Sequence, residues 1–229
     1  MNELDTIARK ILESLEAKNA VREAALTMSR RLIQRSAKAI RATHREEWEK
    51  AKALLAEAGA IVAAIRREVR DHPDIYFAGY IQDALKEFAE AHITYALITG
   101  QPLPDPDDLE VEYAAYLNGL GEAAGEMRRH VLDLIRRGRV EQGERILAAM
   151  DEIYGLLVTV DYPDAITGRL RRTTDMVRGV VERTRGDLTM AVRQEKLQAA
   201  LKEFEGRINA EERAQGRGNS SRRSSVWNT

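Results

Sequence analysis

Three acidic side chains share one face of the stretch "GYIQDALKEFAEAHITYALITG" (79–100), which is otherwise rich in apolar residues. Asp83, Glu87 and Glu90 are followed by Thr94 at helical spacing, so a helix aligns all four. Apolar rows flank this line on both sides: Phe77, Ile81, Ala84, Phe88 and Tyr95 on one, Ile93 and Leu97 on the other. Buried carboxylates require hydrogen bonds, protons or cations. Because Mg²⁺ and Mn²⁺ favour oxygen ligands, the pattern indicates a metal site, with a solvated face as the alternative.

A second acidic pair lies in "YLNGLGEAAGEMRRH" (116–130), where Glu122 and Glu126 are one turn apart. Ala115 and Gly119 precede them on the same face, and small residues there let another helix approach closely. The main apolar stripe of this segment points elsewhere, which favours a solvated pair. If the two acidic helices converge, the four carboxylates are suited to hold one or two metal ions for phosphodiester attack.

Other catalytic chemistries find less support in the sequence. The chain has no Cys, which excludes disulfides, thiolate metal sites and thiol nucleophiles. A di-iron bundle requires Glu-x-x-His twice, but the residues three positions after Glu87 and Glu90 are Glu90 and Ile93. No Ser-His-Asp arrangement can be argued from spacing, so metal-assisted hydrolysis is the chemistry that the residues favour.

A basic stripe, defined as Arg31, Arg35, Lys38, Arg41 and Arg45, occupies one helical face in a segment without acidic residues from Ala24 to Arg45. Solvated faces usually alternate charge signs, and this one does not. Such a row is suited to contact a phosphate backbone without reading bases, which predicts nucleic-acid binding. The alternative is a basic face paired with acidic residues elsewhere in the fold or on a neighbouring subunit.

The elements that must position these residues are all helices. Ala, Leu, Glu and Arg abound, Gly and Pro are scarce, and neither occurs before Gly59. We expect an all-α, single-domain bundle of about six long antiparallel helices, covering approximately 2–44, 46–70, 74–98, 108–137, 140–158 and 164–205. Residues 1–205 form the expected domain, and 206–229 read as a disordered basic, Ser-rich tail.

Assembly and location are predicted from composition and pattern. The last helix carries a long apolar stripe, Leu170, Val177, Val181, Leu188, Val192 and Leu197, which predicts self-association. A chain without Cys, without a secretory signal and without a long apolar run fits a cytoplasmic protein with no membrane partner.

Three segments together resemble the translin family, which includes translin-associated factor X: "SRRLIQRSAKAIRATHR" (29–45), "GYIQDALKEFAEA" (79–91) and "EYAAYLNGLGEAAGEMRR" (112–129). The resemblance covers about 20–200, in order and with compatible spacing. It implies an all-α fold that assembles into a hollow, roughly spherical octamer, here a homo-octamer, and binds single-stranded RNA or DNA. In the catalytic branch it implies an Mg²⁺- or Mn²⁺-dependent endoribonuclease that acts inside the shell.

The family's catalytic acids match here at Glu87, Glu90 and Glu122, and the acid one turn further matches at Glu126. The catalytic branch usually has Asp where this chain has Glu122, so the longer side chain is a departure. The translin branch itself lacks the full acidic set, and retention of Glu87 and Glu90 therefore favours the catalytic branch. The resemblance also places the first four residues of the basic stripe in the nucleic-acid-binding helix of the family.

Three functions follow. The leading prediction is a metal-dependent endoribonuclease that cuts single-stranded or short RNA. The first alternative is a non-catalytic single-stranded RNA- or DNA-binding oligomer with the same shell. The second is an all-α nucleoside triphosphate pyrophosphatase, which also begins with Glu-x-x-Glu on a helix. The second acidic pair here departs from that pattern in its step and its distance along the chain.

Overall fold

The computed structural model describes residues 3–223, with side-chain environments for 3–210. This part of the chain holds eight helices and no strand, so the all-α prediction is confirmed. Six are long and two have four residues each. Their bounds are α1 Glu3–His44, α2 Trp48–Glu68, α3 Pro73–Tyr76, α4 Gly79–Thr99, α5 Tyr113–Arg136, α6 Val140–Thr159, α7 Asp164–Thr167 and α8 Leu170–Arg223.

Two helix interruptions differ from the sequence prediction. The expected helix over 74–98 is split, because Ala78 adopts an extended conformation (φ −65°, ψ 140°) and α4 begins only at Gly79. The expected helix that starts at Asp164 is also split, at Gly168 and Arg169, which both have left-handed φ angles of 60° and 68°. A glycine stands at each break, Gly79 and Gly168, but no proline does, and the sequence prediction continued both helices through these glycines.

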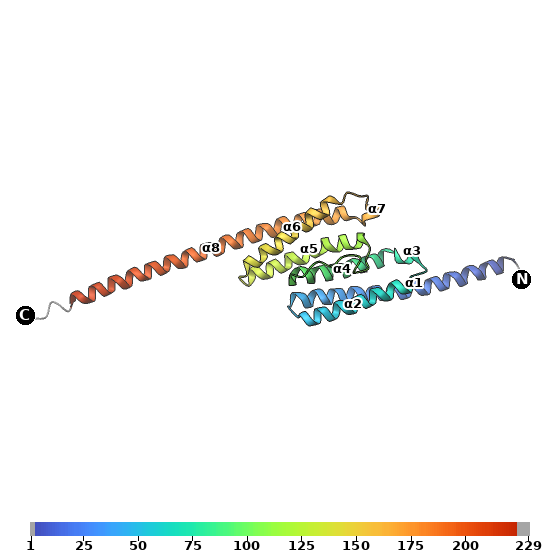
Figure 1. Ribbon diagram of the computed structural model, residues 1–229, viewed down its shortest axis with the longest axis horizontal. Coiled ribbons are helices and arrows are strands. Elements are labelled where there is room, and N and C mark those ends of the chain that lie inside the picture. The colour runs from blue at the N-terminus through green and yellow to red at the C-terminus, as the bar shows by residue number, and fades with distance from the viewer. Residues whose placement is uncertain (1–2, 224–229) are drawn as a thin grey trace, which may run out of the picture. The chain divides into compact units, whose positions relative to one another are not determined.

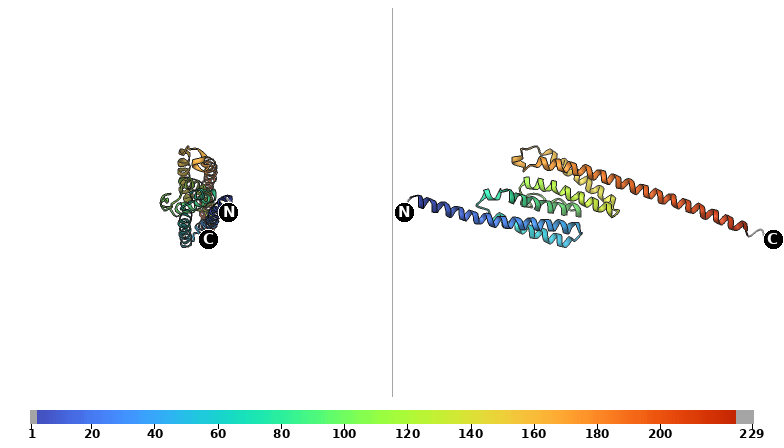
Figure 2. Two further views of the ribbon diagram at one scale, coloured as in Figure 1. Left: turned by 90° about the vertical axis from the view of Figure 1, so that its right-hand side faces the viewer. Right: turned by 180° about the vertical axis from the view of Figure 1, so that it is seen from behind.

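The long helices of residues 1–185 lie side by side in a layered bundle (Figures 1 and 2). The α1–α2 hairpin packs on one side of α4, and α5 packs on the other side of α4 and against α6. The core between them is aliphatic, with large side chains such as Leu32, Ile65, Leu85, Leu120 and Met150 fully buried. Burial of this apolar area is the main stabilising contribution to the bundle, and it fixes α4 and α5 as central neighbours.

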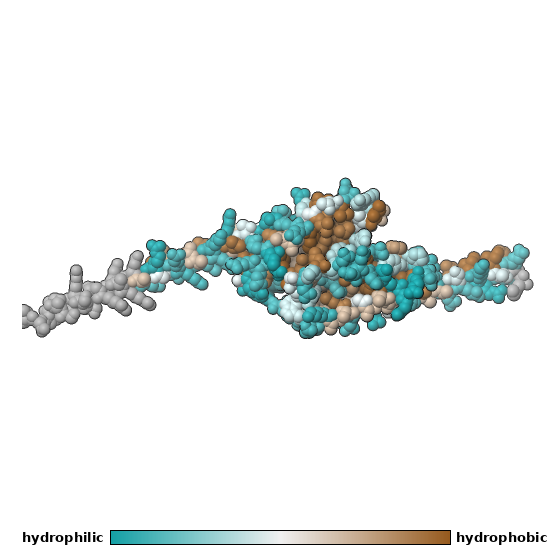
Figure 3. Space-filling model, in the orientation of Figure 1, coloured by the Kyte–Doolittle hydropathy of each residue, from teal (hydrophilic) through white to brown (hydrophobic). Residues whose placement is uncertain are grey.

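The first turns of α1 have no partner in the described chain. Leu4, Ile7, Ile11 and Leu15 are each more than half exposed, and Figure 3 shows apolar surface along this end of α1. An apolar stripe at helical spacing without a packing partner is typical of a segment that contacts another molecule. The assembly itself stays a prediction.

A second compact unit begins at Gly186, and its described part, up to Arg223, contains most of α8. The helix continues to Arg223, past the end predicted near Glu205, and no proline occurs after Pro163 to stop it. The predicted boundary between a domain and a tail at 205–206 stays a prediction, and 224–229 lie outside the described residues. Of the apolar stripe predicted on this helix, Val177 and Val181 are buried, whereas Leu197 is 60% exposed. None of the described helices has the length and apolarity that a membrane span requires.

Candidate metal centre and nucleic-acid interface

Three of the four predicted acidic ligands come together between α4 and α5. Glu87 and Glu90 from α4 and Glu122 from α5 each place one carboxylate oxygen within 4.8 Å of the other two. This group of three is called the acid cluster below. The spacing in the sequence left open whether the two acidic helices converge, and the structure shows that they do. The acids of α4 and α5 therefore do not form two separately solvated faces.

Close backbone packing is what allows the two helices to bring these acids together. A Cβ atom on Gly119 would lie 2.7 Å from the carbonyl oxygen of Lys86 and 3.1 Å from the amide nitrogen of Glu90. Glycine is therefore required for α5 to approach α4 at this level. Ala115, one turn earlier, is also buried. The small residues singled out in the sequence thus lie where the approach is closest.

The acidic line of α4 runs from solvent into the protein. Asp83 is exposed, Glu87 is half-buried, and Glu90 is 8% exposed. Burial, followed by the negative charges of Glu87, Glu122 and Glu126, raises the pKa of Glu90 to about 8. Burial and the charge of Glu122 also raise the pKa of Glu87.

These shifts reflect carboxylates that lack sufficient compensating positive charge. No hydrogen bond or ion pair to Glu87 or Glu90 is found among the described residues. Three hard oxygen donors at this spacing, short of positive charge, fit the preferences of Mg²⁺ or Mn²⁺.

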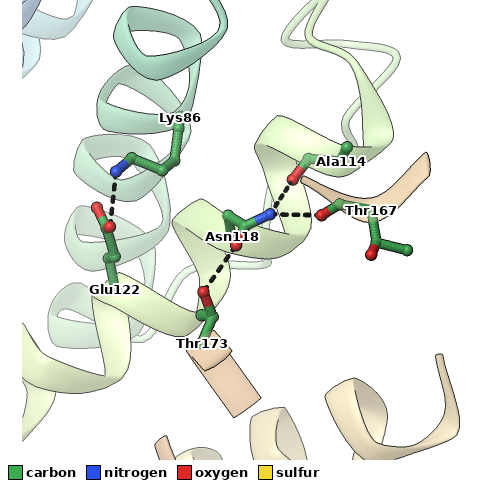
Figure 4. A network of polar contacts seen from close by, with 6 residues as sticks. All are labelled: Lys86, Ala114, Asn118, Glu122, Thr167 and Thr173. Carbon is green, nitrogen blue, oxygen red and sulfur yellow. Dashed lines mark hydrogen bonds and ion pairs between the residues drawn. The ribbon is translucent and has the colours of Figure 1, made fainter. Parts of the chain in front are cut away.

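Lys86 supplies the positive charge that does reach the acid cluster. Its Nζ atom donates a hydrogen bond of 2.6 Å to Oε1 of Glu122 and joins α4 to α5 (Figure 4). The lysine side chain is 20% exposed. Burial alone would lower the pKa of Lys86, but the bond to Glu122 and the charge of that carboxylate outweigh it and raise the pKa. Nothing in the sequence indicated this role for Lys86, since periodicity does not show that a side chain crosses to another helix.

Glu126, the fourth predicted ligand, lies outside the acid cluster. Its Oε2 is 2.5 Å from Nε2 of His44, at the end of α1, and this hydrogen bond is the main reason that the pKa of Glu126 is lowered. His130 lies beside His44, with ring centroids 6.3 Å apart. Burial, followed by the charge of His44, lowers the pKa of His130 to about 4. The arrangement ties α1 to α5 next to the cluster. A metal-ligating role for Glu126 stays a prediction.

Asn118 fixes the turn of α5 that precedes Glu122. Its Nδ2 donates to the carbonyl oxygens of Ala114 and Thr167, at 2.8 and 2.9 Å, and its Oδ1 accepts a 2.7 Å hydrogen bond from Thr173 (Figure 4). These bonds connect α5 to α7 and to the first turn of α8. A buried amide with all of these partners orients the helix that carries Glu122.

A cavity of about 1490 Å³ adjoins the acid cluster. Lys86 and Glu122 line it together with Asp83, and its other walls include Tyr113, Arg169 and Arg172. Of the acid cluster, Glu122 lines this space, which is large enough for a nucleotide-sized ligand, whereas Glu87 and Glu90 are not among its lining residues. Acidic and basic side chains both face it.

The basic stripe lies along the second half of α1. Arg31, Arg41 and Arg45 are exposed, and Arg35 and Lys38 are half-buried. Nε of Arg35 is 2.9 Å from Oε2 of Glu57 on α2, so the paired alternative holds for this member. The other four form no ion pair within the described chain. Most of the stripe is thus available to an anionic partner.

Comparison with known proteins finds relatives with a similar sequence and structures with the same architecture. No family model matches the sequence. The uncharacterized protein MJ0175 of Methanocaldococcus jannaschii is 29% identical over 194 residues, which is 84% of this chain and 86% of that protein. Two solved structures of AfC3PO, one of them of its complex with duplex RNA, are 34% identical and cover 84% of this chain and 98% of theirs. Their TM-scores are 0.75 for the complex and 0.74 for the other structure.

The chain belongs to the translin family. A structure of apo-NeC3PO shares the fold at a TM-score of 0.71 and 21% identity, over 83% of this chain. The resemblance noted in the sequence is confirmed at the level of the family. Translin-family membership argues against the pyrophosphatase alternative, which rested on the Glu-x-x-Glu spacing alone.

Proposed function

We propose that this translin-family protein is an RNA-binding, metal-dependent endoribonuclease, with the acid cluster as its catalytic centre. The observation that carries the proposal is the convergence of Glu87, Glu90 and Glu122 from two helices to within 4.8 Å. Binding of duplex RNA by the related AfC3PO supports RNA as the substrate class. Mg²⁺ or Mn²⁺ is the proposed cofactor, because all three donors are carboxylates.

Each acid has a distinct task in this proposal. Glu90, buried at the base of the cluster, and Glu122, anchored by Lys86, set the positions of the cation-binding oxygens. Glu87 is half-buried and lies nearer to solvent, where it is suited to orient the attacking water. A divalent cation, when bound, supplies activation of water and neutralisation of charge on the phosphodiester. Glu126 is held by His44 and completes the ligand set that we propose.

The basic stripe on α1 is the proposed contact for the RNA backbone. Arg31, Lys38, Arg41 and Arg45 give sequence-independent, salt-sensitive affinity, because such contacts release counterions from the nucleic acid. Arg35 contributes less, since Glu57 already neutralises it. We propose that the protein acts as a cytoplasmic homo-octamer with a hollow interior, and that it also accepts single-stranded DNA. The exposed apolar end of α1 supports self-association.

The test is cleavage of end-labelled single-stranded RNA with Mg²⁺, with Mn²⁺ and with EDTA. We expect cleavage with either cation, none with EDTA, and a loss of more than about 100-fold in the Glu87→Ala/Glu90→Ala variant. Asp83→Asn is the matched control, because Asp83 lies one turn before Glu87 on the same face but outside the cluster. Cleavage that survives in the double variant excludes the proposed centre.

Non-catalytic RNA binding is the second candidate, and the Lys86–Glu122 ion pair favours it. An ammonium group already bound to Glu122 competes with a cation for that carboxylate. This candidate predicts retention of RNA by the wild-type protein in a filter-binding assay without cleavage under any divalent cation.

A further inference from the structure

The acid cluster contains its own counter-ion. Lys86 precedes Glu87 in the chain, yet its side chain reaches across to Glu122 on α5, where Nζ and Oε1 are 2.6 Å apart (Figure 4). Lys86 and Glu122 both line the adjoining cavity, so the ammonium group and the carboxylate that it binds are reached from the same space. An entering cation therefore meets a carboxylate that is already engaged.

The remaining charges near the cluster are negative or are bound elsewhere. Glu87 and Glu90 have no ion-pair partner among the described residues. His44 lies against Glu126, and Arg129 is 3.9 Å from the same carboxylate. Among the side chains with described contacts, Lys86 is the cationic one that binds the cluster directly.

We propose that Lys86 is a positioning residue that acts as an internal counter-ion, which a divalent cation must displace from or share at Glu122. The inference rests on the proposed function, since it concerns cation binding at the same three acids. Lys86 holds Glu122 in place when the site is empty, and it raises the cation concentration at which the site fills. It does so because one carboxylate cannot fully satisfy both an ammonium group and a divalent ion.

Lys86 has opposite effects on two properties of the metal-free protein, the stability of its fold and its affinity for cations. With Lys86, the crowded carboxylates retain a compensating charge, so the fold is more stable and the affinity for cations is lower. Without Lys86, the three acids remain on α4 and α5, but Glu122 loses its anchor and the cluster loses that charge. Their attraction for a cation then increases, as the removal of a neighbouring positive charge increases the proton affinity of a carboxylate.

Lys86→Met tests this inference, because methionine keeps an unbranched stem and removes the charge. Mn²⁺ is titrated into metal-free protein, and free Mn²⁺ is measured by its electron paramagnetic resonance signal. We expect Lys86→Met to bind Mn²⁺ about tenfold more tightly than the wild type, which corresponds to a shift of one unit in the pKa of a carboxylate beside a charge. Affinity that is unchanged or weaker in Lys86→Met overturns the inference.

Two controls separate charge at the site from other causes. Lys52→Met removes the same charge from an exposed pair, in which Lys52 lies 3.1 Å from Glu49 on α2, and we expect no change in affinity. Lys86→Arg keeps the charge and is expected to resemble the wild type. Should Lys86→Met fail to fold by circular dichroism, Lys86→Gln takes its place with the same expectation.

The titration also distinguishes failure of the inference from failure of the proposed function. Glu87→Gln is expected to weaken Mn²⁺ binding strongly. If wild type and Glu87→Gln bind Mn²⁺ equally, the acid cluster is not the cation site, and both proposals fall. If Glu87→Gln loses binding while Lys86→Met equals the wild type, only the role of Lys86 is wrong. Binding by Lys86→Met but not by the wild type supports the counter-ion role in its strongest form.

Discussion

The acid cluster and the basic stripe differ in how the fold treats their charge. The acid cluster takes residues from two helices and crowds like charges into a partly buried place, where Glu90 is 8% exposed. The basic stripe lies on one helix, and three of its five members are exposed to solvent. Like charges are inexpensive in water and costly where burial weakens screening. A crowded and buried charge therefore indicates a specific small ligand, whereas an exposed row suits a long polyanion.

The comparison predicts that the acid cluster depends on backbone packing. Gly119→Ala inserts a methyl group 2.7 Å from the carbonyl oxygen of Lys86 and must push α5 away from α4. We expect a loss of about 3 kcal/mol in the free energy of unfolding, measured by urea denaturation, together with weaker Mn²⁺ binding. Gly125→Ala on the same helix is the control, because no atom lies within 4 Å of its added Cβ, and it should stabilise slightly. Equal stabilities of the two variants would contradict the close approach.

The buried charge of Glu90 should appear in the pH dependence of stability. Its pKa rises from 4.5 to about 8 on folding, so the native state keeps a proton that the unfolded chain releases. The contribution of Glu90 to the stability of the metal-free protein is therefore lost as pH rises from about 4.5 to about 8. We expect Glu90→Gln to be more stable than the wild type at pH 8, by on the order of 2 kcal/mol, and similar at pH 4.

Thermal or urea unfolding of the metal-free protein at both pH values measures this difference. Glu144→Gln, at an exposed position of α6, serves as the control and should follow the wild type. Addition of Mn²⁺ should stabilise the wild type more than Glu90→Gln, because a ligand stabilises the state that binds it. A difference in stability between the wild type and Glu90→Gln that stays constant from pH 4 to pH 8 would show that Glu90 is not held in its protonated form.

The smallest effects are expected on the basic stripe, where each charge is solvated. Lys38→Glu/Arg41→Glu should lower the affinity for single-stranded RNA and reduce the slope of log K against log salt by about two. Arg35→Glu should change that slope less, since its guanidinium group is already paired with Glu57. Lys52→Glu on α2 controls for net charge. Fluorescence anisotropy over a range of salt concentrations measures all of these slopes, and equal slopes would remove the stripe from the interface.

Periodicity in the sequence predicted which residues share a face of one helix, but it did not predict the contacts between helices. The periodicity of Arg31, Lys38 and Arg41 predicted their common face, and the spacing of Glu87 and Glu90 predicted theirs. Whether Glu122 meets them depends on the packing of α5 on α4, which the spacing left open and the translin-family resemblance favoured.

Two contacts near the acid cluster had no periodic signal in the sequence. The partners of Lys86 and of Glu126 lie 36 and 82 residues away along the chain, so local spacing gives no indication of either pair. The left-handed residue Arg169 escaped prediction for a related reason, because a non-glycine residue seldom adopts this conformation without support from the surrounding structure.

Through the amide of Asn118, the geometry of the acid cluster depends on a part of the chain that contributes none of its acids. Through Thr167 and Thr173, this one side chain fastens the corner between α7 and α8 to the helical turn just ahead of Glu122. A substitution at that corner is therefore able to tilt a ligand without touching it. Variation in the chain around 167–173 then becomes a means of tuning cation affinity while the acids themselves stay the same.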